Sequence, residues 1–136
     1  VQTCALPIFF VNISACYAEK YNYNLIVIGA NKEESATFKD NSQEFINAVN
    51  TSLKNSTNNE VQVYAPVINL TKNEIVQKGI ELNIPFKYIY SCYNANEFHC
   101  GKCESCARLK RALEQNNRPD IIEEVFRQED LCRHYS

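Results

Sequence analysis

Four of the seven cysteines fall between residues 92 and 106, in the pattern C-x7-C-x2-C-x2-C. Cysteines at this close spacing on a tight turn can bind one ion together, and Gly101 lets the backbone approach that ion closely. A fourth thiolate from upstream completes a tetrahedron, the geometry that zinc adopts with four sulfur ligands. We therefore predict one structural zinc ion per chain, with no open coordination position for catalysis. The predicted ligands are Cys92, Cys100, Cys103 and Cys106.

Two other readings of this cluster stay open. The same spacing opens the ferredoxin motif for an iron–sulfur cluster, but Lys110 and Arg111 stand where that motif continues with Cys-Pro. His99 could replace one thiolate, although a direct neighbour of Cys100 would have difficulty turning toward the same ion, so we interpret it as a bystander. An odd number of cysteines argues against a disulfide framework of the kind found in secreted proteins.

The other three cysteines lie outside the cluster, two of them near the ends of the chain. The sequence contains no methionine, even at position 1, so we interpret the chain as a fragment of a longer protein. Residues 1–7, which include Cys4, fit poorly with the sequence from residue 8 onward, and our hypothesis is that they are foreign to the natural protein. We predict that Cys16 is a small core residue of a helix and that Cys132 is exposed in a polar tail over residues 127–136.

Composition places the chain among ordinary globular proteins. Its 136 residues suffice for one domain with a hydrophobic core, and 45% hydrophobic residues with a net charge of −2 give no reason to expect a nucleic-acid or membrane partner. No apolar run is long enough to span a bilayer, and the N-terminus lacks the pattern of a signal peptide. We therefore expect a cytoplasmic location.

Hydrophobic patterning predicts alternating helices and strands. Residues 9–21 carry Phe10, Ile13 and Tyr17 at helical spacing, and residues 25–28 form a continuous apolar run typical of a strand buried on both faces of a parallel sheet. A second pair comes next, with a helix through Leu53 after capping residues at 40–42 and a strand over 61–67. Further helices are predicted to begin at residue 71, at residue 107 and near residue 119. The predicted fold class is α/β.

Polar residues around the first predicted strand are candidates for ligand binding. Parallel sheets bind ligands beyond the carboxyl ends of their strands, where Gly29 and Asn31 lie. Asp40, Asn41 and Glu44 fall at a predicted helix N-terminus, where amides and short polar side chains could hold a purine-like base or a phosphate. Simple capping is the competing interpretation, above all for Asn41. The basic residues Arg108, Lys110 and Arg111 could meet phosphates or form a solvated helix face.

At the cysteine cluster the chain resembles the C-terminal signature of the 7-cyano-7-deazaguanine synthases, and the resemblance covers about residues 8–126. The four cysteines match the zinc ligands of that family one by one. The resemblance rests on SCY at 91–93, HCGKCESC at 99–106 and Arg108, and upstream on YAE at 17–19, IGAN at 28–31, TF at 37–38, DNS at 40–42, EFI at 44–46, PVI at 66–68, TK at 71–72 and EIV at 74–76.

The resemblance implies a partial adenine nucleotide α-hydrolase-like fold, which is a Rossmann-like parallel sheet, over residues 8–90, with a zinc-binding segment and terminal helices over 91–126. It implies a ligase that uses ATP to convert 7-carboxy-7-deazaguanine and ammonia into the nitrile precursor of queuosine and archaeosine, two modified nucleosides of tRNA. Small molecules would then be its partners, with no direct nucleic-acid contact, and a homodimer is left open. The resemblance does not identify catalytic residues.

Two departures from the family pattern bear on activity. The Ser-Gly-Gly-x-Asp-Ser loop that holds pyrophosphate in that family does not occur in this sequence, and Leu6-Pro7 stands where the family tends to carry Arg-Asn. We therefore expect these residues alone neither to bind ATP tightly nor to turn over. Two alternatives remain: a zinc-knuckle module that binds RNA, and another tRNA-modifying enzyme of the ATP-pyrophosphatase superfamily.

Overall fold

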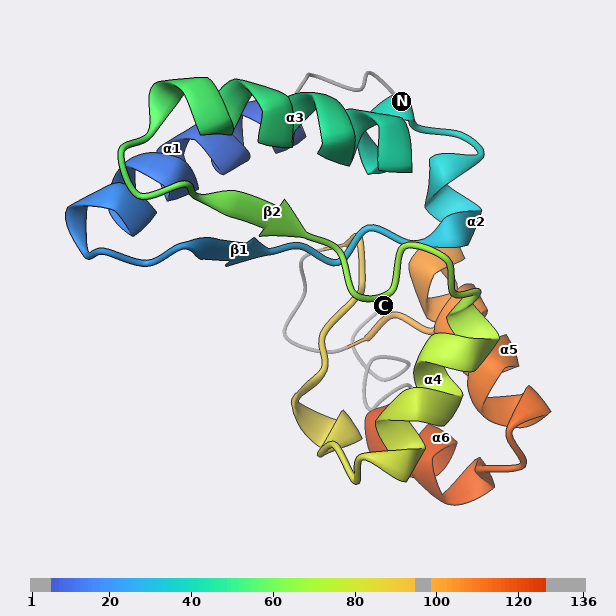
Figure 1. The fold of residues 1–136 in the computed structure, drawn as a ribbon. Coiled ribbons are helices and arrows are strands. Elements are labelled where there is room, and N and C mark those ends of the chain that lie inside the picture. The colour runs from blue at the N-terminus through green and yellow to red at the C-terminus, as the bar shows by residue number, and fades with distance from the viewer. Residues whose placement is uncertain (1–5, 95–98, 127–136) are drawn as a thin grey trace. The chain divides into compact units, whose positions relative to one another are not determined.

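The computed structural model describes residues 6–94 and 99–126 and divides the chain into two compact units, Val1–Thr71 and Lys72–Ser136 (Figure 1). The predictions for Cys4, for Cys132 and for the tail over 127–136 lie outside the described residues, as does most of the segment 1–7. The predicted division into 8–90 and 91–126 stays a prediction. No helix among the described residues is both long enough and apolar enough to cross a membrane.

The first unit is a small parallel sheet with helices. Strand β1 (Leu25–Val27) pairs in parallel with β2 (Gln62–Tyr64), and Ile26 lies opposite Val63. Helix α1 (Leu6–Lys20) precedes β1, and Asn22, with a φ of 57°, ends the helix in a left-handed conformation. Between the strands lie α2 (Lys32–Ser35), the 3₁₀ turn η1 (Lys39–Asn41) and α3 (Gln43–Ser56). The α/β prediction is confirmed.

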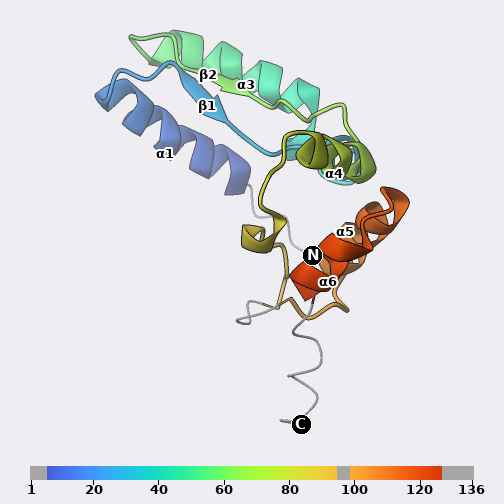
Figure 2. The ribbon, with the colours of Figure 1, turned by 90° about the horizontal axis from the view of Figure 1, so that it is seen from below.

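The core of this unit covers one face of the sheet. Val11, Ala15 and Ala18 of α1 and Ile46, Val49 and Leu53 of α3 are buried in one cluster with Val63, and Ile26 packs against it. Figure 2 shows α1 beside β1 and α3 beside β2. Both helices therefore pack against the sheet face that carries Ile26 and Val63.

Three details of the prediction for this unit are wrong. The buried stripe of α1 is made of small residues and a valine, whereas Phe10, Ile13 and Tyr17 are exposed. Cys16 is also exposed, because it lies beside the buried stripe and not within it. Strand β1 is not buried on both faces among the described residues, since Leu25 and Val27 are exposed.

Asn50 of α3 closes the outer edge of β2. Its side-chain Nδ2 donates to the Val63 carbonyl at 3.0 Å, and its Oδ1 accepts from the Val63 N–H at 2.7 Å. One side-chain amide thus satisfies the two backbone groups that a neighbouring strand would otherwise bind. The contact also fixes α3 to the sheet.

Replacing Asn50 with alanine is expected to lower the free energy of unfolding by about 2 kcal/mol, because the Val63 N–H and carbonyl lose their partners. Urea denaturation of the purified chain measures this. Asn55→Ala is the matched control, since Asn55 is exposed and its side chain donates to the Thr51 carbonyl of its own helix. A loss no larger for Asn50→Ala than for Asn55→Ala would show that the edge contact does not stabilise the unit.

The second unit is built from helices. Helix α4 (Lys72–Glu81) is followed by the 3₁₀ turn η2 (Phe86–Tyr88), and α5 (Glu104–Gln115) is followed by α6 (Pro119–Phe126). Leu113 is fully buried, in one cluster with Val76, Phe86 and Leu109. The helices predicted to begin near residues 71 and 119 are confirmed, and the one predicted from residue 107 begins at Glu104 instead.

Candidate metal centre

The four predicted cysteine ligands meet at one point. Their sulfur atoms all lie within 4.8 Å of one another, and the Sγ atoms of Cys92 and Cys103 are 4.0 Å apart. A tetrahedral zinc ion with Zn–S bonds of about 2.3 Å requires sulfur–sulfur distances of about 3.8 Å. The observed spacing therefore fits a four-coordinate ion with only small adjustments of the side chains.

The loop and the helix that comes after it position these sulfurs. Gly101 adopts a φ of 66°, a left-handed conformation that other residues rarely take, and so allows the chain to turn between Cys100 and Cys103. Cys103 is the N-cap of α5, and Cys106 lies in the first turn of that helix, fully buried. Cys92 comes from the segment after η2 and is also buried.

Backbone amides donate hydrogen bonds to the sulfur atoms of Cys92 and Cys100. The N–H groups of Lys102 and Cys103 donate to the Cys100 sulfur at 3.4 and 3.2 Å, and the Cys100 N–H donates to the Cys92 sulfur at 3.4 Å. The same contacts hold the sulfurs in place around a bound ion.

The thiols differ strongly in acidity when no metal is bound. N–H donors from Tyr93 and Cys106 lower the pKa of Cys103 to about 6, and donors from Cys100 and Asn94 lower the pKa of Cys92. Burial raises the pKa of Cys106 to about 12, and its hydrogen bond with Cys103 acts in the same direction. A divalent metal would have to displace the Cys106 proton, so metal binding should strengthen as the pH rises.

In the metal-free chain, iodoacetamide at about pH 7 is expected to label Cys103 at least tenfold faster than Cys106, because the thiolate is the reactive form. Peptide mass spectrometry after timed quenching measures both rates. Added zinc should suppress labelling of both residues, which separates ligation from simple burial. Faster labelling of Cys106 would contradict the assignment of the two thiols.

His99 lies beside the cluster without belonging to its sulfur group. It is buried, its Nε2 accepts the Ser91 N–H at 3.2 Å, and its ring packs 4.9 Å from Tyr90 and 5.3 Å from Phe126, measured between centroids. Burial lowers the pKa of His99, which favours the neutral ring that can accept this hydrogen bond. His99 thus links the segment that carries Cys92 to the one that carries Cys100.

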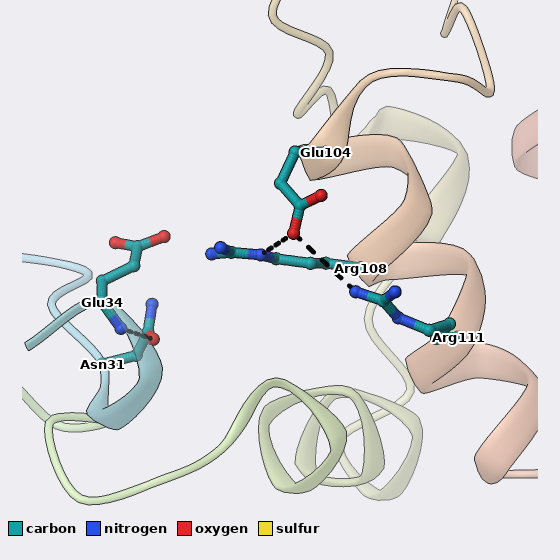
Figure 3. Close-up of polar contacts among 5 residues, drawn as sticks. All are labelled: Asn31, Glu34, Glu104, Arg108 and Arg111. Carbon is teal, nitrogen blue, oxygen red and sulfur yellow. Dashed lines mark hydrogen bonds and ion pairs between the residues drawn. The ribbon is translucent and has the colours of Figure 1, made fainter. Parts of the chain in front are cut away.

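Two of the three basic residues of α5 are paired with an acid. The Glu104 carboxylate lies 2.9 Å from Arg108 Nε and 3.8 Å from Arg111 Nη2 (Figure 3). Lys110 extends over the Phe126 ring, with 6.0 Å from its Nζ to the ring centroid. These contacts favour a solvated helix face over a phosphate site, although exposed pairs of this kind contribute little to stability.

Three of the five predicted ligand-binding residues line one cavity of about 290 Å³ in the first unit. Gly29, Asp40 and Asn41 all face it, and Asn41 Nδ2 donates to Asp40 Oδ1 at 3.3 Å. A Cβ atom added at Gly29 would have no neighbour within 4 Å, so the cavity is open at that point. Most of the remaining wall is apolar.

The other two predicted residues lie elsewhere. Asn31 is buried as the N-cap of α2, where its Oδ1 accepts the N–H groups of Glu33 and Glu34 at 3.2 Å each; Figure 3 draws the Glu34 bond. Glu44 lines a different hollow of about 570 Å³, together with Asp40 and Lys39. Their assignment to ligand binding stays a prediction, and capping already accounts for the Asn31 side chain.

The contribution of α1 to the cavity does not emerge from the sequence pattern. Phe10 and Ser14 line the cavity from that helix, together with Gly29 and Asp40. Because the apolar spacing predicts the wrong buried face of α1, it assigns neither residue to a site. The sequence signal that could have indicated this part of the cavity is a small polar residue, Ser14, one helical turn after the aromatic residue Phe10.

Comparison with known proteins gives one family. The family model described as queuosine biosynthesis protein QueC matches residues 6–117. A 7-cyano-7-deazaguanine synthase of Carboxydothermus hydrogenoformans is 52% identical over 103 residues, which are 76% of this chain and 48% of that protein.

Two further relatives carry the same name. The synthase of Methanobrevibacter smithii is 45% identical over 106 residues, or 78% of this chain and 47% of the relative. That of Methanosphaera stadtmanae is 41% identical over 114 residues, or 84% of this chain and 50% of the relative. The chain therefore spans about half the length of the curated relatives that it matches.

Proposed function

This chain belongs to the QueC family of queuosine biosynthesis proteins, and from that premise we propose that it is the zinc-binding half of a 7-cyano-7-deazaguanine synthase. The observation that carries the proposal is the convergence of Cys92, Cys100, Cys103 and Cys106, with all four sulfurs within 4.8 Å of one another. The relatives that share this half bear the name of that synthase.

The zinc ion has a structural role in this proposal. Four thiolates fill its coordination shell, so it offers no position for water or substrate. When bound, the ion joins the segment after η2 to the first turn of α5, and it thereby closes the loop between them. Its contribution is to the stability of residues 72–126.

We assign the cavity beside β1 to the substrate of the synthase. Its volume of about 290 Å³ is close to the lower end of the range usual for small-molecule sites. The apolar wall can cover the face of a flat base, while Asp40 and Asn41 can form hydrogen bonds with its edge. The proposed substrate is 7-carboxy-7-deazaguanine.

The reaction requires more than these residues supply. In the proposed sequence ATP activates the carboxylate as an adenylate, ammonia replaces AMP to give an amide, and a further ATP drives dehydration to the nitrile. The described residues provide a wall for the base and the zinc centre. We assign phosphate binding and the catalytic groups to the part of the synthase outside the matched region.

The test joins this chain to the unmatched portion of the C. hydrogenoformans synthase and measures nitrile formation from 7-carboxy-7-deazaguanine, ammonia and ATP by mass spectrometry. Gly29→Phe should fill the cavity and reduce kcat/KM by at least about tenfold, because the added ring occupies the space of the base. Gly29→Ala adds a single methyl group to open space and serves as the matched control.

Unchanged kcat/KM in Gly29→Phe would show that this cavity does not bind the substrate. Absence of nitrile from the joined protein, in the presence of stoichiometric zinc, would count against the synthase itself. An RNA-binding role receives no support from the geometry, since Glu104 already pairs with Arg108 and Arg111.

A further inference from the structure

Asp40 gives the cavity beside β1 its charge. Among the residues that the structure describes, it is the one charged side chain that lines this space, and Ser14 and Asn41 are the only other polar side chains in the lining. An ionised carboxylate accepts hydrogen bonds and donates none. A ligand edge that meets Asp40 must therefore carry hydrogen-bond donors.

The turn η1 holds this carboxylate in place. The Asn41 N–H donates to the Phe38 carbonyl at 3.0 Å, and the Ser42 N–H donates to the Lys39 carbonyl at 3.2 Å. Ser42 is also the N-cap of α3, so the turn is joined directly to that helix. From the side, Asn41 Nδ2 donates to Asp40 Oδ1 at 3.3 Å and occupies one of the four acceptor positions of the carboxylate.

The walls beside Asp40 suit a flat aromatic ring. Phe10 lines the cavity from α1 and is 58% exposed, so its ring is available to stack on a base. Gly29 has no side chain, and a Cβ atom there would meet nothing within 4 Å. A volume of about 290 Å³ lies just below the usual range for drug-sized ligands, which favours a bare base over a whole nucleotide.

The proposed reaction offers two kinds of base to this cavity, the deazaguanine of the substrate and the adenine of ATP. A guanine-type base carries two adjacent donors on one edge, the ring N1–H and the 2-amino group, and one carboxylate can accept both bonds. Adenine carries an N1 lone pair beside its 6-amino group, so a carboxylate would gain one bond and meet repulsion at the other position. A carboxylate at this point therefore favours the guanine type.

We propose that Asp40 selects the base in this cavity, by accepting both the N1–H and the 2-amino group of a 7-deazaguanine ring. Asn41 orients the carboxylate for the two bonds, so Asp40 determines specificity and Asn41 is a positioning residue. Base selection rests on the proposed function, because the cavity is assigned there to the substrate of the synthase. It adds the contact by which that substrate is distinguished from other bases.

Exchange of one hydrogen-bonding group on each side tests the pairing. Asp40→Asn keeps the shape of the side chain but replaces one acceptor with an NH₂ donor, which suits a base with a 2-oxo group in place of the 2-amino group. The protein is this chain joined to the unmatched portion of the C. hydrogenoformans synthase. Isothermal titration calorimetry without ATP measures the Kd values of 7-carboxy-7-deazaguanine and 7-carboxy-7-deazaxanthine.

The preference between these two ligands is the expected readout. The unaltered joined protein should bind the 2-amino ligand at least about thirtyfold more tightly than the 2-oxo ligand, because the carboxylate repels the 2-oxygen. Asp40→Asn should reverse the order and bind the 2-oxo ligand at least about threefold more tightly. Asn41→Ala should reduce the original preference to less than about tenfold without reversing it.

Glu114→Gln is the matched control, since it removes one negative charge from an exposed residue of α5 outside the cavity. It should keep the preference of the unaltered protein within about twofold. A folding defect in Asp40→Asn would weaken both ligands alike, so a reversed preference reports on the contact itself. The comparison of the two ligands on the unaltered protein needs no variant at all.

Four results would overturn base selection by Asp40. They are a lack of preference in the unaltered protein, a lack of binding of either ligand, an unchanged preference in Asp40→Asn, and equal weakening of both ligands in that variant. A preference in Asn41→Ala equal to that of the unaltered protein would refute the positioning role of Asn41. Because binding is measured without turnover, a reversed preference in a joined protein that forms no nitrile would support base selection and count against the synthase reaction alone.

Discussion

Cys106→Ser is expected to abolish stoichiometric zinc binding and to unfold residues 72–126 at room temperature. Cys106 is fully buried in the core of this unit and is one of the four converging sulfurs, so the substitution removes a ligand and leaves a hydroxyl in its place. Binding free energy of structural zinc is also folding free energy, and the loss should exceed about 3 kcal/mol. Elemental analysis and thermal unfolding measure the two effects.

The matched control is Cys16→Ser, which changes an exposed cysteine of α1 outside the cluster. We expect it to keep one zinc ion per chain and to alter the free energy of unfolding by less than about 0.5 kcal/mol. Equal zinc content and equal stability in the two variants would show that the four sulfurs do not act together on one ion.

The second large effect is expected for Leu113→Ala. Leu113 is fully buried between the helices of the second unit, in the cluster that includes Cys92 and Cys106. Its truncation leaves a cavity and should lower the free energy of unfolding by about 2–5 kcal/mol. Because folding and metal binding are coupled, the apparent zinc affinity should fall as well.

Competition with a colorimetric chelator measures that affinity, and denaturation with and without zinc measures the stability. Leu82→Ala is the control, since Leu82 is largely exposed and lies just beyond α4. A Leu113→Ala chain that loses stability but keeps the parent zinc affinity would separate the metal centre from the helical core, contrary to the expected coupling.

The cysteine cluster can be predicted because its members lie close together in the sequence. Three of the four cysteines fall within seven residues, and Gly101 marks the turn that brings them together. Local spacing therefore determines most of the geometry. The fourth sulfur, from Cys92, joins the others because the segment between it and Cys100 is short.

The orientation of α1 cannot be predicted in the same way. Both of its faces carry apolar residues, so periodicity alone does not show that Val11 and Ala15 are buried while Phe10 and Ile13 stay exposed. Small side chains allow a helix to approach a sheet closely, and this packing outweighs the larger hydrophobicity of the aromatic residues. The exposed face of β1 has a related cause. Its continuous apolar sequence suits a strand that is covered on both faces, whereas this unit covers one face of it.

The polar sequence patterns identify some of the residues that line the cavity, but not all of the candidates lie there. Gly29, Asp40 and Asn41 line one cavity, although only the fold brings the turn over 39–41 beside the end of β1. Asn31 satisfies backbone amides of α2 instead, a role that the sequence equally allows. The pairing of Glu104 with Arg108 agrees with their i, i+4 spacing on a helix, which the sequence already contains.

The most direct test of the four-sulfur centre is X-ray absorption at the zinc K-edge on the purified chain, with zinc quantified in the same sample. Ligation by the four cysteines predicts one zinc ion per chain with four sulfur neighbours at about 2.3 Å and no nitrogen or oxygen in the first shell. A shell that contains a nitrogen or oxygen ligand, or iron as the bound metal, would contradict it.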